Sequence, residues 1–249
     1  MWTRGSLKMR ARDILRISYF KALLASLVLA LVVGDGRMFS FETRDWWDGG
    51  VRLMNGEPLQ FAETPMLVAG ILSGMFFAII IAIVARIFIG LPIEVGVQKY
   101  FVDSTGESFD LNNLGYAFKQ GHYKTIVRTM FFRELYIFLW TLLLVIPGIV
   151  KHYAYRMVPY ILAENPNIDT KRALELSNNM TRGHKFNMWI LDLSFIGWYL
   201  LGLLAFGLGV FLVMPYENAT RAELYIVLKE TAFDAGICKE TELHHISVN

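Results

Sequence analysis

The chain contains 249 residues, of which 55% are hydrophobic and only 18% are charged, and its formal net charge is +2. This composition is poor in charge for a soluble domain and supplies enough apolar residues for several membrane spans. The small net charge argues against nucleic acid as a partner. A single cysteine, Cys238, excludes an intrachain disulfide and a pair of thiolate ligands for a metal.

The N-terminal quarter predicts an interfacial helix, a first span and an outer loop. Residues 6–16 place apolar residues at helical spacing among several cations, a pattern typical of a helix at a membrane surface. Residues 19–33 follow as a span, interpreted as a retained helix rather than a cleaved signal peptide. Residues 34–64 contain three Arg and six acidic residues. The positive-inside rule therefore places this loop outside and the N-terminus in the cytoplasm.

The next three apolar stretches predict spans two to four. Residues 66–85 are twenty consecutive residues without a charge, enough to cross a bilayer, and we expect the second span over 66–89. A basic segment follows, and then a third span over 135–146 that ends at the helix-breaking pair Pro147 and Gly148. We expect a short fourth span over 149–162, because a second basic segment follows it and must return to the cytoplasm.

The last third predicts a surface helix and two further spans. Residues 170–180 form an amphipathic helix with Asp169 as N-cap, whose neighbouring cations either contact anionic headgroups or only mark the topology. Residues 186–204 and 206–228 are the fifth and sixth spans, so both termini are cytoplasmic. We expect residues 1–230 to be a single transmembrane helical domain and residues 231–249 a polar cytoplasmic tail.

An internal repeat groups these elements. The segments LGYAFKQGHYKTIVRTMFF and LSNNMTRGHKFNMWILDL both contain Gly-His before an apolar span, and Pro159-Tyr160 and Pro215-Tyr216 follow at equivalent places. The segments ISYFKALL and GLPIEV suggest a fainter third copy. The sequence thus predicts an all-α polytopic bundle of about six spans as three helical hairpins, with amphipathic cytoplasmic helices. Chance similarity between apolar helices is the alternative. The expected helix breaks are Pro147, Gly148, Pro159 and Pro215, which either line a site or only bend a helix.

Several long segments resemble the bacterial integral-membrane family catalogued as domain of unknown function 975. They are SLKMRARDILRISYFKALLASLVLAL, PGIVKHYAYRMVPYILAEN, ALELSNNMTRGHKFNMWILDLSFIGWYLLGL and MPYENATRAELY. The resemblance covers nearly the whole chain. It implies a multi-pass inner or plasma membrane protein of bacteria, without an agreed activity and without catalytic residues to carry over.

Polar residues inside the predicted spans form the candidate site, since the sequence contains no His-Glu-x-x-His, Gly-x-Ser-x-Gly or Gly-Lys-Ser/Thr motif. Besides Arg86 and Glu134, they are Lys151, His152, Arg156, Asp192, Glu217 and Arg221. We expect Lys151 or Arg156 to pair with an acid, because an unpaired charge in a membrane is costly. The pairs either lock helices together or line a cavity for a lipid headgroup or a small anionic solute.

These features favour a non-enzymatic envelope accessory protein that acts through lipid or protein contacts and needs no cofactor or metal. The expected partners are membrane lipids, including anionic headgroups, and another membrane protein. The alternative is a small transporter or lipid-handling protein with a polar intramembrane cavity. A membrane-embedded hydrolase is a third class, without a motif in its favour.

Overall fold

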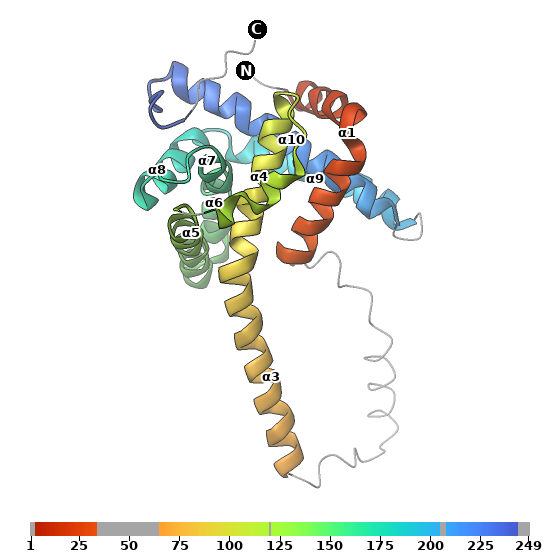
Figure 1. Cartoon of the computed structure of the whole chain (residues 1–249), viewed down its shortest axis with the longest axis vertical. Coiled ribbons are helices and arrows are strands. Elements are labelled where there is room, and N and C mark those ends of the chain that lie inside the picture. The colour runs from red at the N-terminus through yellow and green to blue at the C-terminus, as the bar shows by residue number, and fades with distance from the viewer. Residues whose placement is uncertain (1–2, 34–64, 120, 205–207, 244–249) are drawn as a thin grey trace.

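The computed structural model describes residues 3–33, 65–119, 121–204 and 208–243, and every regular element within these ranges is helical (Figure 1). The predicted all-helical fold is therefore confirmed. The predicted outer loop, residues 34–64, lies outside the described residues. The helices in chain order are α1 (Arg4–Val33), α3 (Pro65–Ala85), the π-helix η2 (Arg86–Gly90), α4 (Leu91–Thr105), the 3-10 helix η3 (Leu111–Phe118), α5 (Tyr123–Leu143), α6 (Val145–Ala154), α7 (Val158–Glu164), α8 (Thr170–Met180), α9 (Lys185–Leu204) and α10 (Leu208–Asp234).

Helix α1 contains the two predicted N-terminal helices, joined at Ser18, whose φ of −144° and ψ of 43° are not helical. Before this kink, Leu7, Ala11 and Leu15 recur every four residues and are buried. This half of α1 lies against α10, and Arg10 pairs with Glu223 of that helix at 3.9 Å. The amphipathic half thus uses its apolar face to contact the protein.

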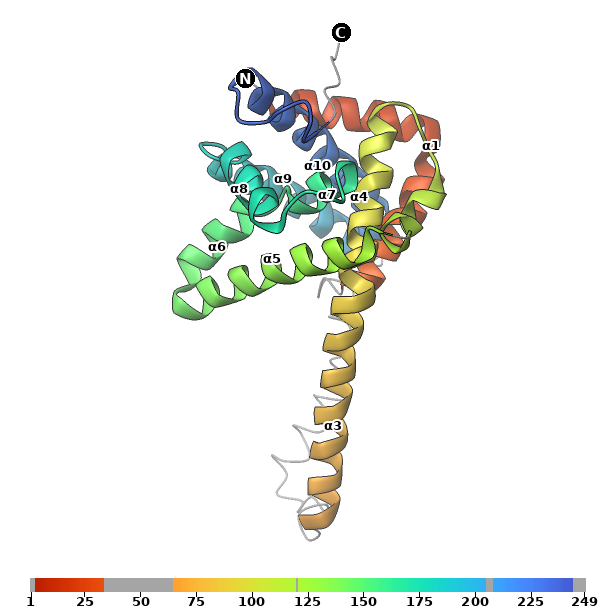
Figure 2. The ribbon, with the colours of Figure 1, turned by 60° about the vertical axis from the view of Figure 1, so that its left-hand side comes forward.

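Helix α3 continues through η2 into α4 and projects away from the other helices (Figures 1 and 2). The stretch Leu72–Thr105 is the one described helix that is long and apolar enough to cross a bilayer. The π-helical turn η2 comes directly before α4, whose second residue is Pro92. Because proline donates no hydrogen bond and crowds the preceding turn, a widened turn accommodates it.

The predicted third span and the start of the fourth form a hairpin of unequal helices. The break between α5 and α6 lies at Leu144, three residues before the predicted pair Pro147 and Gly148. Proline is tolerated in the first turn of a helix, so Pro147 lies at the start of α6. Gly148 allows the two helices to meet, because a Cβ there would lie 2.6 Å from Cα of Thr141.

The predicted fourth span over 149–162 is not one helix. It is divided at residues 155–157 between α6 and α7, and Pro159 lies in the first turn of α7. The side chains of α7 from Val158 to Ala163 are buried in the protein. This segment is apolar because it forms part of the core, and it has no face available for lipid.

Helices α9 and α10 occupy the positions of the predicted fifth and sixth spans. Gly202 and Gly209 lie against each other near their junction, where a Cβ on Gly202 would come within 2.7 Å of the carbonyl carbon of Gly209. Pro215 lies inside α10, which runs without interruption to Asp234. The predicted break at Pro215 is therefore absent.

The expected six-span bundle is not confirmed. In Figure 2 the α5–α6 hairpin runs crosswise to α3, and in Figure 1 the same hairpin is viewed nearly along its axis. The buried core lies where α1, α4, α7 and α10 meet. Apolar length and the positive-inside rule predicted the spans, whereas packing between helices decides their directions.

The two Gly-His segments of the predicted repeat adopt the same local structure. Gly121 and Gly183 have φ of 91° and 82°, the left-handed region that favours glycine. The following carbonyls of His122 and His184 accept from the amides of Ile126 and Met188, at 3.0 and 2.9 Å. The copies then diverge, because the first contains the break between α6 and α7 whereas α10 is continuous.

The surface helix α8 starts where predicted, since the carboxylate of Asp169 accepts hydrogen bonds from the amides of Lys171 and Arg172. Arg172 does not extend toward headgroups. Its Nε donates to Glu242 at 2.7 Å, and its Nη2 donates to the carbonyl of Ile237 at 2.8 Å. The guanidinium therefore holds the C-terminal segment against α8.

The C-terminal segment is part of the folded domain as far as residue 243. Helix α10 continues past the predicted boundary at residue 230, and Cys238 and Leu243 are buried. The predicted polar tail therefore includes a packed segment. The ion pair between Arg172 and Glu242 holds this segment against α8.

Breaking this pair with Glu242→Gln is expected to increase the rate of Cys238 thiol labelling about fivefold, equivalent to about 1 kcal/mol for a partly exposed pair. Burial protects the thiol and raises the pKa of Cys238 to about 11. The hydrogen bond from Arg172 lowers the pKa of Glu242 below its ordinary value of 4.5. The pair therefore stabilises the segment above pH 4.5, and this stabilisation is lost as pH falls through the folded-state value.

Labelling with dithiodipyridine, which reacts at acid pH, tests both statements. The wild type should become more reactive as the pH is lowered from 5 to 3, whereas Glu242→Gln should show little further change. The exposed neighbour Glu240 provides the matched control, Glu240→Gln. Equal labelling rates of wild type and Glu242→Gln at pH 7 would show that the pair does not hold the segment closed.

Candidate functional site

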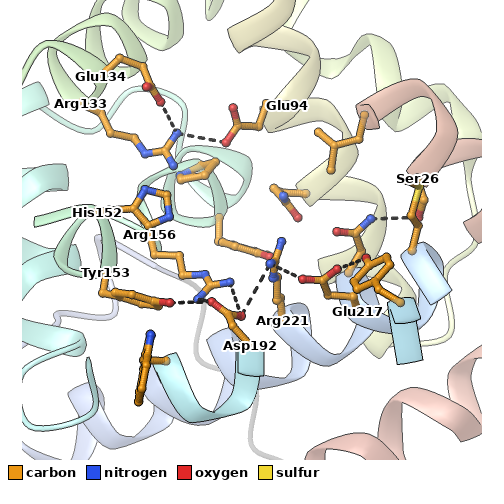
Figure 3. A pocket seen from close by; sticks show the side chains of 18 of the residues that line it. Ser26, Glu94, Arg133, Glu134, His152, Tyr153, Arg156, Asp192, Glu217 and Arg221 are labelled. Atoms are coloured by element: carbon orange, nitrogen blue, oxygen red, sulfur yellow. Dashed lines mark hydrogen bonds and ion pairs between the residues drawn. The ribbon is translucent and has the colours of Figure 1, made fainter. Parts of the chain in front are cut away.

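A cavity of about 490 Å³ lies where α4, α5, α6, α7, α9 and α10 approach one another (Figure 3). Charged residues from η2, from the turn between α6 and α7, and from four of these helices line it. Four are arginines and four are carboxylates, so their formal charges cancel: Arg86, Arg133, Arg156, Arg221, Glu94, Glu134, Asp192 and Glu217. Most of these side chains come from helices that are far apart in the sequence.

Asp192, in the middle of α9, is the centre of one ion-pair cluster (Figure 3). Its two carboxylate oxygens accept one hydrogen bond each from Nη2 and Nη1 of Arg156, both at 2.8 Å, and the hydroxyl of Tyr153 donates to it at 2.9 Å. Nη2 of Arg221 lies 3.6 Å from the same carboxylate. Arg156 is located in the turn between α6 and α7, so the break in the predicted fourth span positions this arginine.

A second cluster extends along α10. Arg221 donates to Glu217, one helical turn earlier, and the hydroxyl of Tyr199 on α9 donates to the same carboxylate. Glu217 is buried. Arg221 therefore connects two carboxylates, Asp192 and Glu217, and ties α9 to α10 across one wall of the cavity.

The third cluster surrounds Arg133 of α5, which is buried. Its Nη1 donates to Glu94 of α4 and to Glu134, each at 3.0 Å, and its Nε donates to the carbonyl of Tyr155 at 3.2 Å. This arginine therefore has several acceptors, which offset the cost of removing its charge from water.

Three buried polar atoms in the cavity lining have no hydrogen-bond partner in the structure. They are Oε1 of Gln98, the hydroxyl of Tyr160 and Nε of Arg221. Buried polar groups are usually hydrogen-bonded, because leaving one unpaired costs about 1–3 kcal/mol. The three atoms include both a donor and an acceptor. The cavity thus presents unused hydrogen-bonding capacity beside its compensated charges.

The structure brings five of the six predicted cluster residues together in the cavity lining: His152, Arg156, Asp192, Glu217 and Arg221. Arg86 and Glu134 also line it. Lys151 lies elsewhere, with its Nζ 5.2 Å from the ring centre of Trp140 and 5.5 Å from that of Tyr155. The side chain of Lys151 therefore lies against these rings, whereas its neighbour His152 lines the cavity.

Sequence reasoning missed Glu94, Gln98, Arg133 and Tyr160. It assigned Arg133 to a cytoplasmic basic segment and treated the residues after Pro92 only as a faint repeat copy. A Pro-x-Glu pattern recurs at residues 92–94 and 215–217, and both glutamates pair with an arginine in the lining. This recurrence is the signal that could have identified Glu94.

In the part of the chain that the structure describes, these features define a helical protein with one membrane-length apolar helix and a charge-paired cavity. Comparison with protein families matches residues 66–232 to "Protein of unknown function (DUF975)", and the chain belongs to this family. The match runs from α3 into α10 and includes all eight charged lining residues. A search of curated proteins and a search of solved structures each returned no match.

Proposed function

We propose that this is a multi-pass membrane protein that binds a neutral or zwitterionic lipid headgroup in its cavity and catalyses no reaction. The observation that carries the proposal is the cavity lining, whose four arginines and four carboxylates cancel. The net charge of a charged ligand would find no opposite net charge in this lining. A zwitterion can instead bond to both the donors and the acceptors of the cavity.

The membrane location is supported by the exposed apolar helix α3 and by the charges around it. Helix α3 crosses in this proposal, and the second half of α1, which exposes Phe20 and Leu24 and whose helix contacts η2 and α4, provides the other crossing. The basic segment 4–16 then lies in the cytoplasm, and the acidic segment 34–64 lies outside. Both termini are cytoplasmic, because the chain crosses an even number of times.

The cavity lies at the level that headgroups would occupy. Large apolar side chains are exposed along α3 and η2 as far as Ile89, whereas Leu91 is buried. Arg86 and Glu94, on either side of this change, line the cavity. The polar lining therefore begins where the lipid-facing surface ends.

The rim of the cavity supports a lipid rather than a soluble molecule. Trp189, Leu193 and Ile196 follow one face of α9, line the cavity and are 41–51% exposed. An acyl chain lying along this face would bury apolar surface, while its headgroup contacts Asp192 and its neighbours on the same helix. The apolar and polar parts of a lipid thus each have a matching surface.

Lipid retention by the purified protein tests the proposal. The protein in detergent is incubated with phosphatidylethanolamine or phosphatidylglycerol, and bound lipid is measured by native mass spectrometry. We expect about tenfold preference for the zwitterionic lipid, equivalent to about 1.4 kcal/mol. Soluble glycerophosphoethanolamine should compete weakly, because it lacks the chains that contact α9. Equal binding of both lipids, or equal competition by the soluble headgroup, would contradict the proposal.

The variant Tyr160→Phe separates ligand binding from stability. Its hydroxyl makes no hydrogen bond within the protein, so we expect an unchanged unfolding temperature but about fivefold weaker lipid retention, equivalent to one hydrogen bond of about 1 kcal/mol. Tyr100→Phe is the matched control, because its hydroxyl is also buried but lies outside the lining. Lipid or solute flux in liposomes containing the protein would instead support a transporter.

A further inference from the structure

We infer that the α5–α6 hairpin is embedded in a single leaflet of the bilayer and returns to the side from which it entered. This inference rests on the proposed membrane location and concerns a different part of the molecule from the cavity. It replaces the third and fourth predicted spans. The sidedness of the termini stays the same, because a hairpin that enters and leaves by one face removes two crossings.

The apolar part of the hairpin is too short to cross. Its tip consists of the end of α5 and the start of α6, where Leu142 is 73% exposed and Ile146 is 77% exposed. The apolar residues 145–150 of α6 extend about 9 Å, whereas the hydrocarbon core is about 30 Å thick. Beyond them α6 ends and the buried helix α7 begins. The exposed apolar surface is therefore too short to span both leaflets.

Aromatic residues and a lysine surround the base of the apolar tip. The ammonium of Lys151 lies over the rings of Trp140 and Tyr155, and Tyr136 lies beside Tyr155 with ring centres 6.5 Å apart. Tryptophan, tyrosine and lysine are the residues that occupy the headgroup level of membrane proteins. Because these residues lie on the cavity side of the tip, we infer that lipid, rather than an apolar groove of another protein, surrounds the exposed tip.

The tip satisfies several of its polar groups internally, as a lipid environment favours. The hydroxyl of Thr141 donates to the carbonyl of Ile137 at 2.8 Å. The amides of Leu144 and Gly148 donate to the carbonyls of Trp140 and Leu144, both at 3.1 Å. Pro147, in the first turn of α6, removes an amide that would otherwise need a partner.

The direction of the hairpin supports the same conclusion. It runs crosswise to α3 in Figure 2, so it cannot cross a bilayer that α3 also crosses along its length. A crosswise hairpin at the cavity end of α3 lies in the plane of one leaflet, as amphipathic interfacial helices do.

Single-cysteine labelling tests the inference in the full chain, in a Cys238→Ala background. The probe position is Leu144→Cys, at the exposed tip. Lys171→Cys on the exposed face of α8 reports the cytoplasmic face, and Gly50→Cys in the segment 34–64 reports the opposite face. Each variant is treated with a membrane-impermeant maleimide in intact cells and in inverted vesicles. A bimane label at position 144 is then exposed to lipids carrying nitroxides at shallow or deep acyl positions.

We expect Leu144→Cys to react at least about tenfold more slowly than either control from both faces, because the tip is removed from water. The bimane should be quenched more by shallow nitroxides than by nitroxides at the chain ends. Labelling of Leu144→Cys together with Gly50→Cys would show a full crossing, and labelling together with Lys171→Cys would show a tip outside the membrane. Either result overturns the inference. If Gly50→Cys and Lys171→Cys react from the same face, the result contradicts the proposal that α3 crosses the membrane.

Discussion

Replacing Asp192 with alanine is expected to lower the free energy of unfolding by about 3–5 kcal/mol, because it leaves a buried guanidinium without its carboxylate. Asp192 accepts two hydrogen bonds from Arg156 and one from Tyr153, and it lies 3.6 Å from Arg221. Only 8% of Arg156 is exposed. Chemical unfolding in detergent micelles, followed by tryptophan fluorescence, measures the change.

A surface ion pair and a double variant serve as controls for Asp192. Asp13 and Arg16 are 4.0 Å apart on the exposed side of α1, so Asp13→Ala should cost less than about 0.5 kcal/mol. The combination Arg156→Met with Asp192→Leu should recover part of the loss, because it removes both charges together. If the double variant is as unstable as the sum of its single changes, the cost does not come from a stranded charge.

Replacing Glu164 with alanine should destabilise the protein by a similar amount, about 3–5 kcal/mol, by isolating a buried ammonium. The side chain of Lys229 is 0% exposed, and its Nζ donates to Oε1 of Glu164 at 2.7 Å. This pair joins α7 to α10 outside the cavity. Unfolding of Glu164→Ala in the same detergent assay measures its contribution to the fold without altering the ligand site.

The paired variant Lys229→Met with Glu164→Leu distinguishes a stranded charge from lost packing. We expect it to be more stable than Glu164→Ala, since side chains of similar size replace both ions. Its lipid retention should equal that of the wild type, because neither residue lines the cavity. A large loss of lipid binding in a stable paired variant would show that the cavity depends on this contact.

The charged residues of the cavity both form ion pairs between helices and line an open volume, the two arrangements that the sequence left open. Arg133, Arg156 and Arg221 all form closed ion pairs between helices, which stabilise the arrangement. The same residues surround an open volume and leave some polar atoms unpaired. If the ion pairs filled the whole space between the helices, no cavity would remain. If the buried charges were unpaired, their desolvation would destabilise the fold.

Local signals predicted the parts of the structure that depend on neighbouring residues. The N-cap at Asp169 and the apolar run of α3 follow from backbone conformation and hydropathy within a few positions. The assignment of the fourth span failed, since an apolar stretch has the same composition whether it faces lipid or a protein core. Helix α7 is buried against other helices, which hydropathy does not reveal.

The sequence by itself determined that the protein is helical, that it belongs to its family, and that Arg156, Asp192, Glu217 and Arg221 need partners. Local propensity and the cost of a buried charge are sufficient for the first and the third of these conclusions, whereas the family follows from the similarity of sequence segments. Only the tertiary structure decided that Arg133 and Glu94 join them, that Lys151 lies against aromatic rings, and that the α5–α6 hairpin runs crosswise to α3. These features depend on contacts between residues far apart in the chain, and helix directions are set by packing rather than by composition.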